Sequence, residues 1–84
     1  MKYRKKPVVV EAFQFGVEGM PDWFLLDERV VWGNKEGKTP LFCIIKTSSG
    51  LVTGDCGDYV IKGIDGEIYI CKATAFMMSY EEVY

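Results

Sequence analysis

The chain has 84 residues, of which ten are basic and twelve acidic, and its formal charge is −2. It contains no histidine, which excludes Ser-His and Cys-His catalytic couples, an imidazole general base and histidine metal sites. A chain of this length forms a single domain, residues 1–84, here with a basic flank at residues 1–6. The rest of the chain holds all twelve acidic residues and only six basic ones. This acidic body argues against nucleic-acid binding, which needs a broad basic face.

The same length makes a monomer only marginally stable. A folded chain of 9.5 kDa exposes roughly 5,000 Å², compared with about 13,800 Å² for the unfolded chain. Burial of the apolar part of that difference contributes on the order of 130 kcal/mol. Ordering 84 residues costs about 126 kcal/mol. Because the two quantities nearly cancel, we expect copies of the chain to form a homo-oligomer.

The first half of the chain predicts a long strand, a short helix and a short strand. Residues 7–15 are β-branched and aromatic, and both of their alternating faces are apolar, so we expect cover on both sides. Within this strand Glu11 is a carboxylate among apolar neighbours. Pro21 suits the first position of a helix over 21–27. A strand at 30–32 and a turn-rich loop at 33–40 follow.

The second half predicts two hairpins and a closing helix. Residues 41–53 alternate around a Ser-Ser-Gly turn, and residues 59–72 around a turn that ends at Gly66. Thr74 is placed to cap a helix that ends at residue 80. The elements together predict an α+β fold, a small curved antiparallel β-sheet or partial barrel with two short helices.

The cysteines indicate the compartment. Cys43, Cys56 and Cys71 are odd in number and form no C-x-x-C pair, so we expect no metal site and a reducing cytoplasm. Cys43 lies in an apolar run, where a buried thiol acts as a small hydrophobic group. The longest apolar run has five residues, so we expect no membrane span.

Two parts of the sequence resemble a known family. These are Tyr3–Ala12 and, more closely, the positions Gly57–Gly63, Gly66–Tyr69, Cys71, Lys72, Phe76, Tyr80 and Glu81. They resemble a widespread family of small phage and prophage proteins with no established activity. Relatives commonly carry proline where this chain has Cys56 and Ile70. The resemblance implies a bacteriophage accessory protein acting in the host cytoplasm, where such proteins capture nucleotide immune signals or bind host enzymes.

The hairpin at 59–72 carries one group of candidate site residues. Lys62, Glu67 and Tyr69, with Tyr59 at the start, can line a pocket in which lysine contacts phosphate and tyrosine stacks on a base. The alternative is ordinary cross-strand pairing on a half-exposed face.

Carboxylates form the second group. Asp55 and Asp58 lie in a loop with glycine and can hold a cation, ribose hydroxyls or a cationic partner; alternatively, they close Asx-turns on nearby backbone N–H groups. If buried, Glu11 would have a raised pKa and could act as a general acid or base. Structural pairing of Glu11, for example with a lysine, is the alternative.

Large apolar side chains form the third group. We expect most of them to lie in the core, although one small core cannot hold them all, so that some form a surface for self-association or a partner. They are Trp23, Phe24, Leu25, Leu26, Trp32, Phe76, Met77 and Met78.

The expected function is a non-enzymatic phage binding protein with no catalytic residue, metal or cofactor. The favoured ligand is a small anion, such as a nucleotide signal held between subunits, with phosphate contacts from Arg4, Lys5, Lys6 and Lys62. Binding and blocking of a host protein through an aromatic and methionine surface is the alternative, and a small metal-dependent enzyme is the third. The full set of expected ligand contacts is Arg4, Lys5, Lys6, Glu11, Trp23, Asp58, Tyr59, Lys62, Glu67 and Tyr69.

Overall fold

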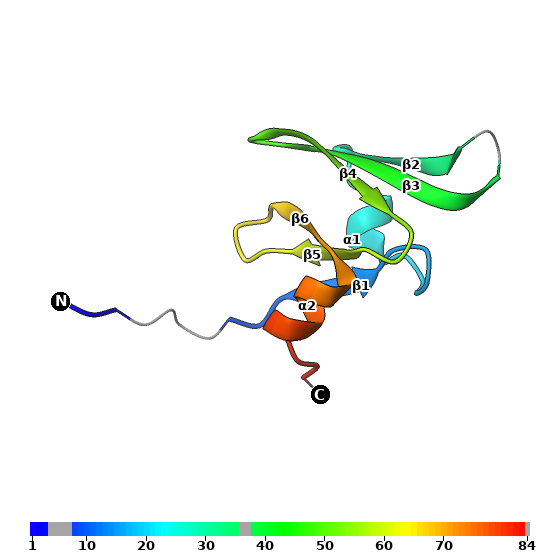
Figure 1. Cartoon of the computed structure of the whole chain (residues 1–84). Coiled ribbons are helices and arrows are strands. Elements are labelled where there is room, and N and C mark those ends of the chain that lie inside the picture. The colour runs from blue at the N-terminus through cyan, green and yellow to red at the C-terminus, as the bar shows by residue number, and fades with distance from the viewer. Residues whose placement is uncertain (4–7, 36–37, 84) are drawn as a thin grey trace.

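The computed structural model describes residues 1–3, 8–35 and 38–83, and within these the side chains of 35 and 38–40 are not described. Six strands and two helices follow one another along the chain (Figure 1). They are β1 (Glu11–Gln14), α1 (Asp22–Leu25), β2 (Val30–Lys35), β3 (Lys38–Thr47), β4 (Gly50–Asp55), β5 (Tyr59–Lys62), β6 (Ile68–Cys71) and α2 (Ala73–Ser79). None of the helices in the described ranges is long and apolar enough to cross a membrane.

The strands form two separate antiparallel sheets. One has the order β1-β5-β6 and the other the order β2-β3-β4, and neither closes into a barrel. Both predicted hairpins are present, as β3–β4 and β5–β6. The prediction of a small antiparallel α+β fold with two short helices is therefore confirmed, with two three-stranded sheets in place of one curved sheet.

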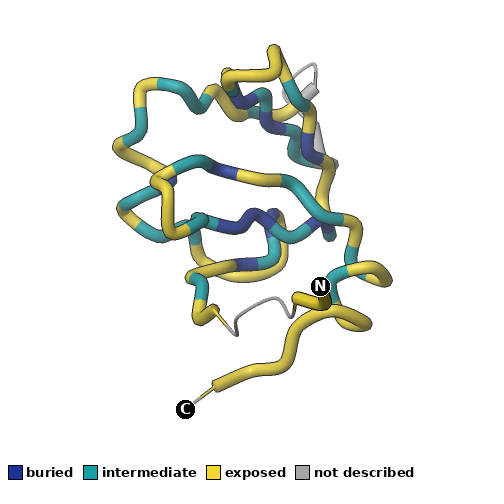
Figure 2. Tube along the Cα trace, turned by 90° about the vertical axis from the view of Figure 1, so that its left-hand side faces the viewer, coloured by how far each residue is buried: buried dark blue, intermediate teal, exposed yellow. Residues whose placement is uncertain are grey.

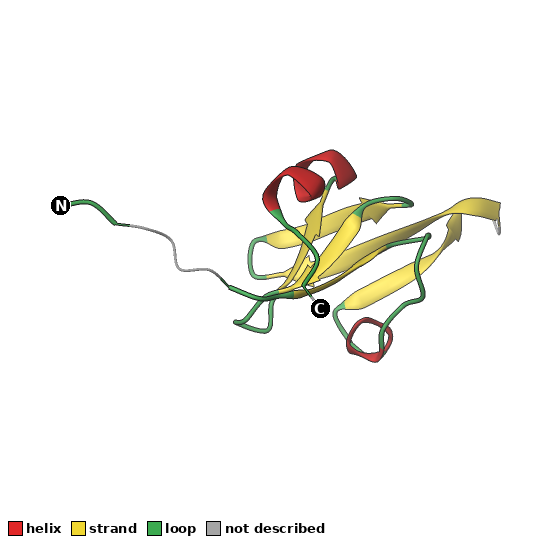
Figure 3. Cartoon of the chain, turned by 90° about the horizontal axis from the view of Figure 1, so that it is seen from below, coloured by secondary structure: helices red, strands yellow, loops and turns green. Residues whose placement is uncertain are grey.

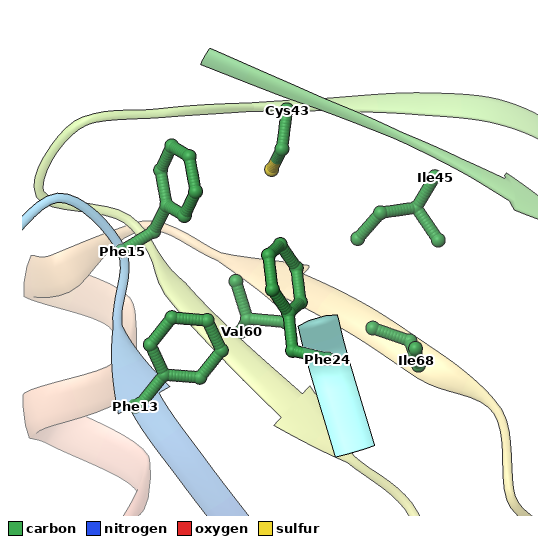
Figure 4. Packing of buried hydrophobic residues seen from close by; sticks show 7 residues of the cluster. All are labelled: Phe13, Phe15, Phe24, Cys43, Ile45, Val60 and Ile68. Atoms are coloured by element: carbon green, nitrogen blue, oxygen red, sulfur yellow. The ribbon is translucent and has the colours of Figure 1, made fainter. Parts of the chain in front are cut away.

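A small aromatic core joins the two sheets to α1 (Figure 4). Phe24 of α1 is fully buried, and its ring centroid lies 5.0 Å from that of Phe13 and 5.8 Å from that of Phe15. Edge-to-face packing of such rings contributes about 0.5–1.5 kcal/mol per pair beyond area burial. The other members of the buried cluster come from β3, β5 and β6, namely Cys43, Ile45, Val60 and Ile68.

The two helices lie on opposite sides of the strands (Figure 3). In α1 the backbone N–H groups of Phe24 and Leu25 donate to the carbonyl of Pro21. The helix predicted over 21–27 covers only Asp22–Leu25, and Pro21 is its N-cap residue and not its first helical position. In α2 the residue before the first turn is Lys72, not Thr74, and its side chain makes no capping hydrogen bond. The capping prediction for Thr74 is wrong because the helix begins one residue before it.

Three predictions about the first half are wrong in extent. The strand predicted over 7–15 covers only Glu11–Gln14. It is not covered on both sides, because Glu11 and Ala12 are exposed whereas Phe13 is buried. The loop predicted over 33–40 is mostly strand, because pairing of β2 with β3 continues through Gly33 and Asn34. Tertiary pairing overrides the turn propensity of these residues.

The prediction that most of the large apolar residues lie in the core is also wrong. Only Phe24 is buried, and Trp23 and Phe76 are half-buried. Helices of four and seven residues each offer little more than one inward-facing turn, so most of their apolar side chains lie on the surface, and Trp32 is exposed on the edge strand β2. The exposed members are Leu25, Leu26, Trp32, Met77 and Met78.

Candidate functional site

An open groove of about 670 Å³ lies between α2 and the face of the β1-β5-β6 sheet that turns away from the core. Alternation along the strands produces this face. Phe13 and Val60 point into the core, whereas Ala12, Gln14 and Tyr59 line the groove. The groove is completed by α2, by residues 8–10 before β1 and by the C-terminal segment, which is exposed along its length (Figure 2). We call it the α2 groove.

Three stacked rings form one wall of the α2 groove. The rings of Tyr59 and Phe76 are nearly parallel, with centroids 3.9 Å apart and an angle of 7° between planes. Phe76 stacks in turn on Tyr80, with centroids 4.8 Å apart and an angle of 17°. Phe76 and Tyr80 are four residues apart, the spacing that places side chains on one helix face. The stack thus fixes α2 to β5 and leaves Tyr80 as the outer ring, 40% exposed.

A methionine and three carboxylates lie beside the stack. Met77 is 68% exposed, and its sulfur lies 3.9 Å from the Tyr59 hydroxyl. Glu18, Glu81 and Glu82 line the groove, and none of the described residues that line it is basic. Glu18 accepts a hydrogen bond from the backbone N–H of Gln14 at 2.8 Å, which holds this carboxylate at the groove. The groove is therefore apolar and aromatic inside, with negative charge at its edge.

A buried carboxylate holds the start of α2. Asp58 is only 5% exposed, and its Oδ2 accepts hydrogen bonds from the backbone N–H of Asp55 at 2.9 Å and from Nζ of Lys72 at 3.1 Å. The hydrogen bond to Asp58 raises the pKa of the Lys72 ammonium, and the negative charges of Asp58 and Asp55 add to the rise. Lys72 immediately precedes α2, so this contact fixes where the helix begins.

Asp58 therefore has a structural role in this arrangement, but it does not close the predicted Asx-turn, because its partner is the backbone N–H of Asp55, three residues before it. Sequence reasoning missed Lys72. The register of the predicted hairpin could have found it, because Tyr59 pairs with Cys71 and the next positions outward are Asp58 and Lys72.

A second, shallower hollow of about 420 Å³ brings Trp23 and Lys62 together beside α1. We call it the Trp23 hollow. Its Arg29 is already engaged: the guanidinium donates to Asp27 from Nε at 3.0 Å and from Nη2 at 2.7 Å. Nη2 also donates to the carbonyl of Gly66 at 3.0 Å. These bonds hold the pKa of the Asp27 carboxyl below its usual range. With Asp22 also lining the hollow, the two cations face two carboxylates.

The remaining predicted residues are divided between the two sides of the sheet. In the strand register Lys62 of β5 lies opposite Glu11 of β1 and Ile68 of β6. Glu11 is exposed and is the first residue of β1. Glu67 lies near Arg29, with Oε2 3.9 Å from Nη1. The structure thus separates Lys62 from Tyr59, which lines the α2 groove.

Tyr69 belongs to neither cavity. Its hydroxyl donates to Asp65 at 2.7 Å, which lowers the pKa of the Asp65 carboxyl and raises the pKa of the Tyr69 phenol. Arg4, Lys5 and Lys6 lie outside the described residues. In the ranges that the structure describes, no three potential metal-ligating side chains gather in one place.

Comparisons with protein-family models, curated proteins and solved structures give no match to this chain. A functional proposal therefore depends on the chemistry of the two cavities. The α2 groove offers stacked rings, exposed methionine and negative charge. The Trp23 hollow offers one indole and a nearly neutral set of charges.

Proposed function

We propose that this protein is a non-enzymatic binding module that captures another protein through the α2 groove. In the setting that the resemblance implies, it is a phage accessory protein that binds and blocks a host protein in the cytoplasm. The observation that carries the proposal is the apolar surface around the aromatic stack, where Met77 lines the groove and is 68% exposed. Flexible, polarizable methionine side chains and aromatic rings are typical of protein-binding surfaces.

The test compares two charge substitutions at exposed apolar residues. Met77→Glu places a carboxylate in the α2 groove, whereas Leu51→Glu places one on the exposed side of β4, away from it. We expect the wild-type chain and Leu51→Glu to retain the same partner from a bacterial lysate, and Met77→Glu to lose it. Protection from hydrogen exchange in the complex should map to residues 8–14 and 73–83. A partner retained equally by Met77→Glu would exclude the α2 groove as the binding surface.

A nucleotide-type anion in the Trp23 hollow is the second candidate. The supporting observation is that Trp23, Arg29 and Lys62 line the same hollow, so an indole can stack on a base while cations contact phosphate. It ranks below protein binding because Asp22 and Asp27 offset both cations. Calorimetry with a panel of cyclic and ADP-ribose-type nucleotides tests it. Binding should weaken in Lys62→Gln and stay unchanged in Lys46→Gln; a panel without heat excludes this candidate.

We also propose that copies of the chain associate. β2 is the edge strand of its sheet and exposes Val31 and Trp32. Exposed apolar edge strands readily pair with a second chain. Sedimentation at increasing concentration should show a dimer that weakens in Val31→Lys, and a monomer at all concentrations would refute association.

A further inference from the structure

We infer that the α2 groove selects a cationic partner segment, one in which arginine or lysine alternates with aliphatic side chains. The inference rests on the proposed function, because it names the chemistry of the partner that the same groove takes. It replaces the anionic ligand expected from the sequence for this part of the molecule. Its basis is the combination of an apolar interior, an exposed outer ring and an acidic edge.

The interior of the groove provides the surface for aliphatic side chains. Val8, Val10 and Ala12 line it on one side, and Phe76 and Met77 on the other. A volume of about 670 Å³ lies within the range of roughly 300–1,000 Å³ of sites that enclose most of a ligand's surface. When aliphatic side chains of a partner bind here, the apolar surfaces of both the partner and the groove are removed from water, which favours binding.

The edge of the groove determines the sign of the partner's charge. Glu18 comes from the turn after β1, whereas Glu81 and Glu82 follow α2. Two segments that are far apart in the sequence thus each bring carboxylates to the groove. In the part of the chain that the structure describes, no basic side chain lies within 4 Å of these three carboxylates. An anionic ligand would meet only like charge from these residues, whereas a cation gains complementary charge, which speeds association and selects partners.

The outer ring favours a cation at the same place. Phe76 covers one face of Tyr80, and Tyr80 remains 40% exposed next in sequence to Glu81. A guanidinium stacked on an aromatic face and paired with a carboxylate satisfies both its π-face and its N–H groups. Arginine therefore suits this position better than lysine does.

The experiment uses the full chain and three labelled ten-residue peptides in a fluorescence anisotropy titration. The first alternates arginine with leucine, the second replaces every arginine by glutamine, and the third by glutamate. We expect the arginine peptide to bind at least about 10-fold more tightly than the glutamine peptide, and the glutamate peptide not to bind. Each exposed charge pair accounts for about 1.4- to 5-fold in affinity, so Glu81→Gln with Glu82→Gln should weaken the arginine peptide by about 2- to 25-fold.

Controls separate charge from folding. Glu28→Gln removes an exposed carboxylate near α1 that does not line the groove, and it should leave the affinities of the arginine and glutamine peptides unchanged. Both glutamates of the double variant follow the C-terminal end of α2, where loss of negative charge does not destabilise a helix, and circular dichroism verifies the fold. Equal binding of the arginine and glutamine peptides, or equal effects of the double variant and Glu28→Gln, would overturn the inference.

The outcomes distinguish this inference from the proposed function. If Met77→Glu loses its lysate partner but the arginine peptide has no advantage, the cationic assignment fails and the proposed function stands. If Met77→Glu retains that partner and no peptide binds, both fail. A peptide with the sequence of residues 1–10, which is itself basic, tests a second copy as the occupant. If that peptide binds more tightly than the arginine peptide, the inference that the groove takes a foreign partner is overturned.

Discussion

Removal of the Asp58 carboxylate tests how the groove is held. In the wild-type chain Asp58 Oδ2 lies 2.9 Å from the backbone N of Asp55 and 3.1 Å from Nζ of Lys72. Asp58→Ala removes this acceptor from both donors. A hydrogen bond to a charged group contributes about 1.5–3 kcal/mol. The Lys72 side chain is 67% exposed, so its ion pair is screened by solvent and contributes only about 0–1 kcal/mol. The substitution should therefore lower the free energy of unfolding by about 1.5–4 kcal/mol.

That loss is large for a chain of this size. Stabilities of about 0.05–0.15 kcal/mol per residue give roughly 4–13 kcal/mol for 84 residues. With a urea dependence of about 1 kcal/mol per molar, the unfolding midpoint should fall by about 1.5 M or more. The backbone N–H of Phe76, which donates to the carbonyl of Lys72 at 2.9 Å, should also exchange with solvent faster, because α2 loses its anchor.

The control is Asp55→Ala. The Asp55 side chain is 68% exposed and reaches Lys72 only at 3.9 Å, so its loss should change the free energy of unfolding by less than about 0.5 kcal/mol. Asp58→Asn keeps an acceptor oxygen without the charge and should fall between the two. If Asp58→Ala lowers the urea midpoint no more than Asp55→Ala does, Asp58 does not hold this loop and the reasoning is refuted.

Three further outcomes follow from burial and pairing. Phe24→Ala should lower the free energy of unfolding by about 3–5 kcal/mol, and Leu26→Ala, at an exposed position, by less than about 0.5 kcal/mol; equal losses in urea titrations would place the core elsewhere. Burial raises the pKa of the Cys43 thiol to about 11, so a thiol reagent at pH 8 should modify the exposed Cys56 first and Cys43 only on unfolding, as mass spectrometry would show. The lowered pKa of Asp27 means that its contribution to stability is complete above its ordinary value of 3.8 and is lost as the pH falls through the folded value. The stability difference between wild type and Asp27→Asn should therefore shrink from pH 5 towards pH 2, and a difference that grows on acidification would contradict this assignment.

Local signals predicted the two hairpins. Alternating apolar residues with a glycine at each turn specify β3–β4 and β5–β6, and Gly50 and Gly66 have φ of 118° and 82°, values that favour glycine. Strand β1 was predicted too long because its apolar residues indicate burial but do not indicate which part of the chain covers them. Residues 8–10 line the open α2 groove, so these apolar side chains contribute to a surface groove and not to the core.

The site was only partly predictable. Tyr59 was identified as a candidate, but Phe76 was assigned to the core, and the stack between them joins residues 17 positions apart through the return of the chain from β6 into α2. No periodicity within one element specifies such a contact. The Trp23 hollow was likewise invisible in the sequence, since it unites α1 with the β5–β6 hairpin.

Folding also changes the meaning of the charge distribution. In the sequence, four cations gather in the first six residues, and this concentration favoured an anionic ligand. In the fold, Glu18 from the turn after β1 and Glu81 and Glu82 from the C-terminal segment meet at the α2 groove, although more than 60 positions separate them. The apolar surface that offers the most contact thus carries the charge that repels anions. Because the chain has no histidine, mild acidification adds no imidazolium charge to this groove. We therefore expect added salt, which screens exposed charges over about 10 Å at 0.1 M, to weaken the proposed contact with a cationic segment.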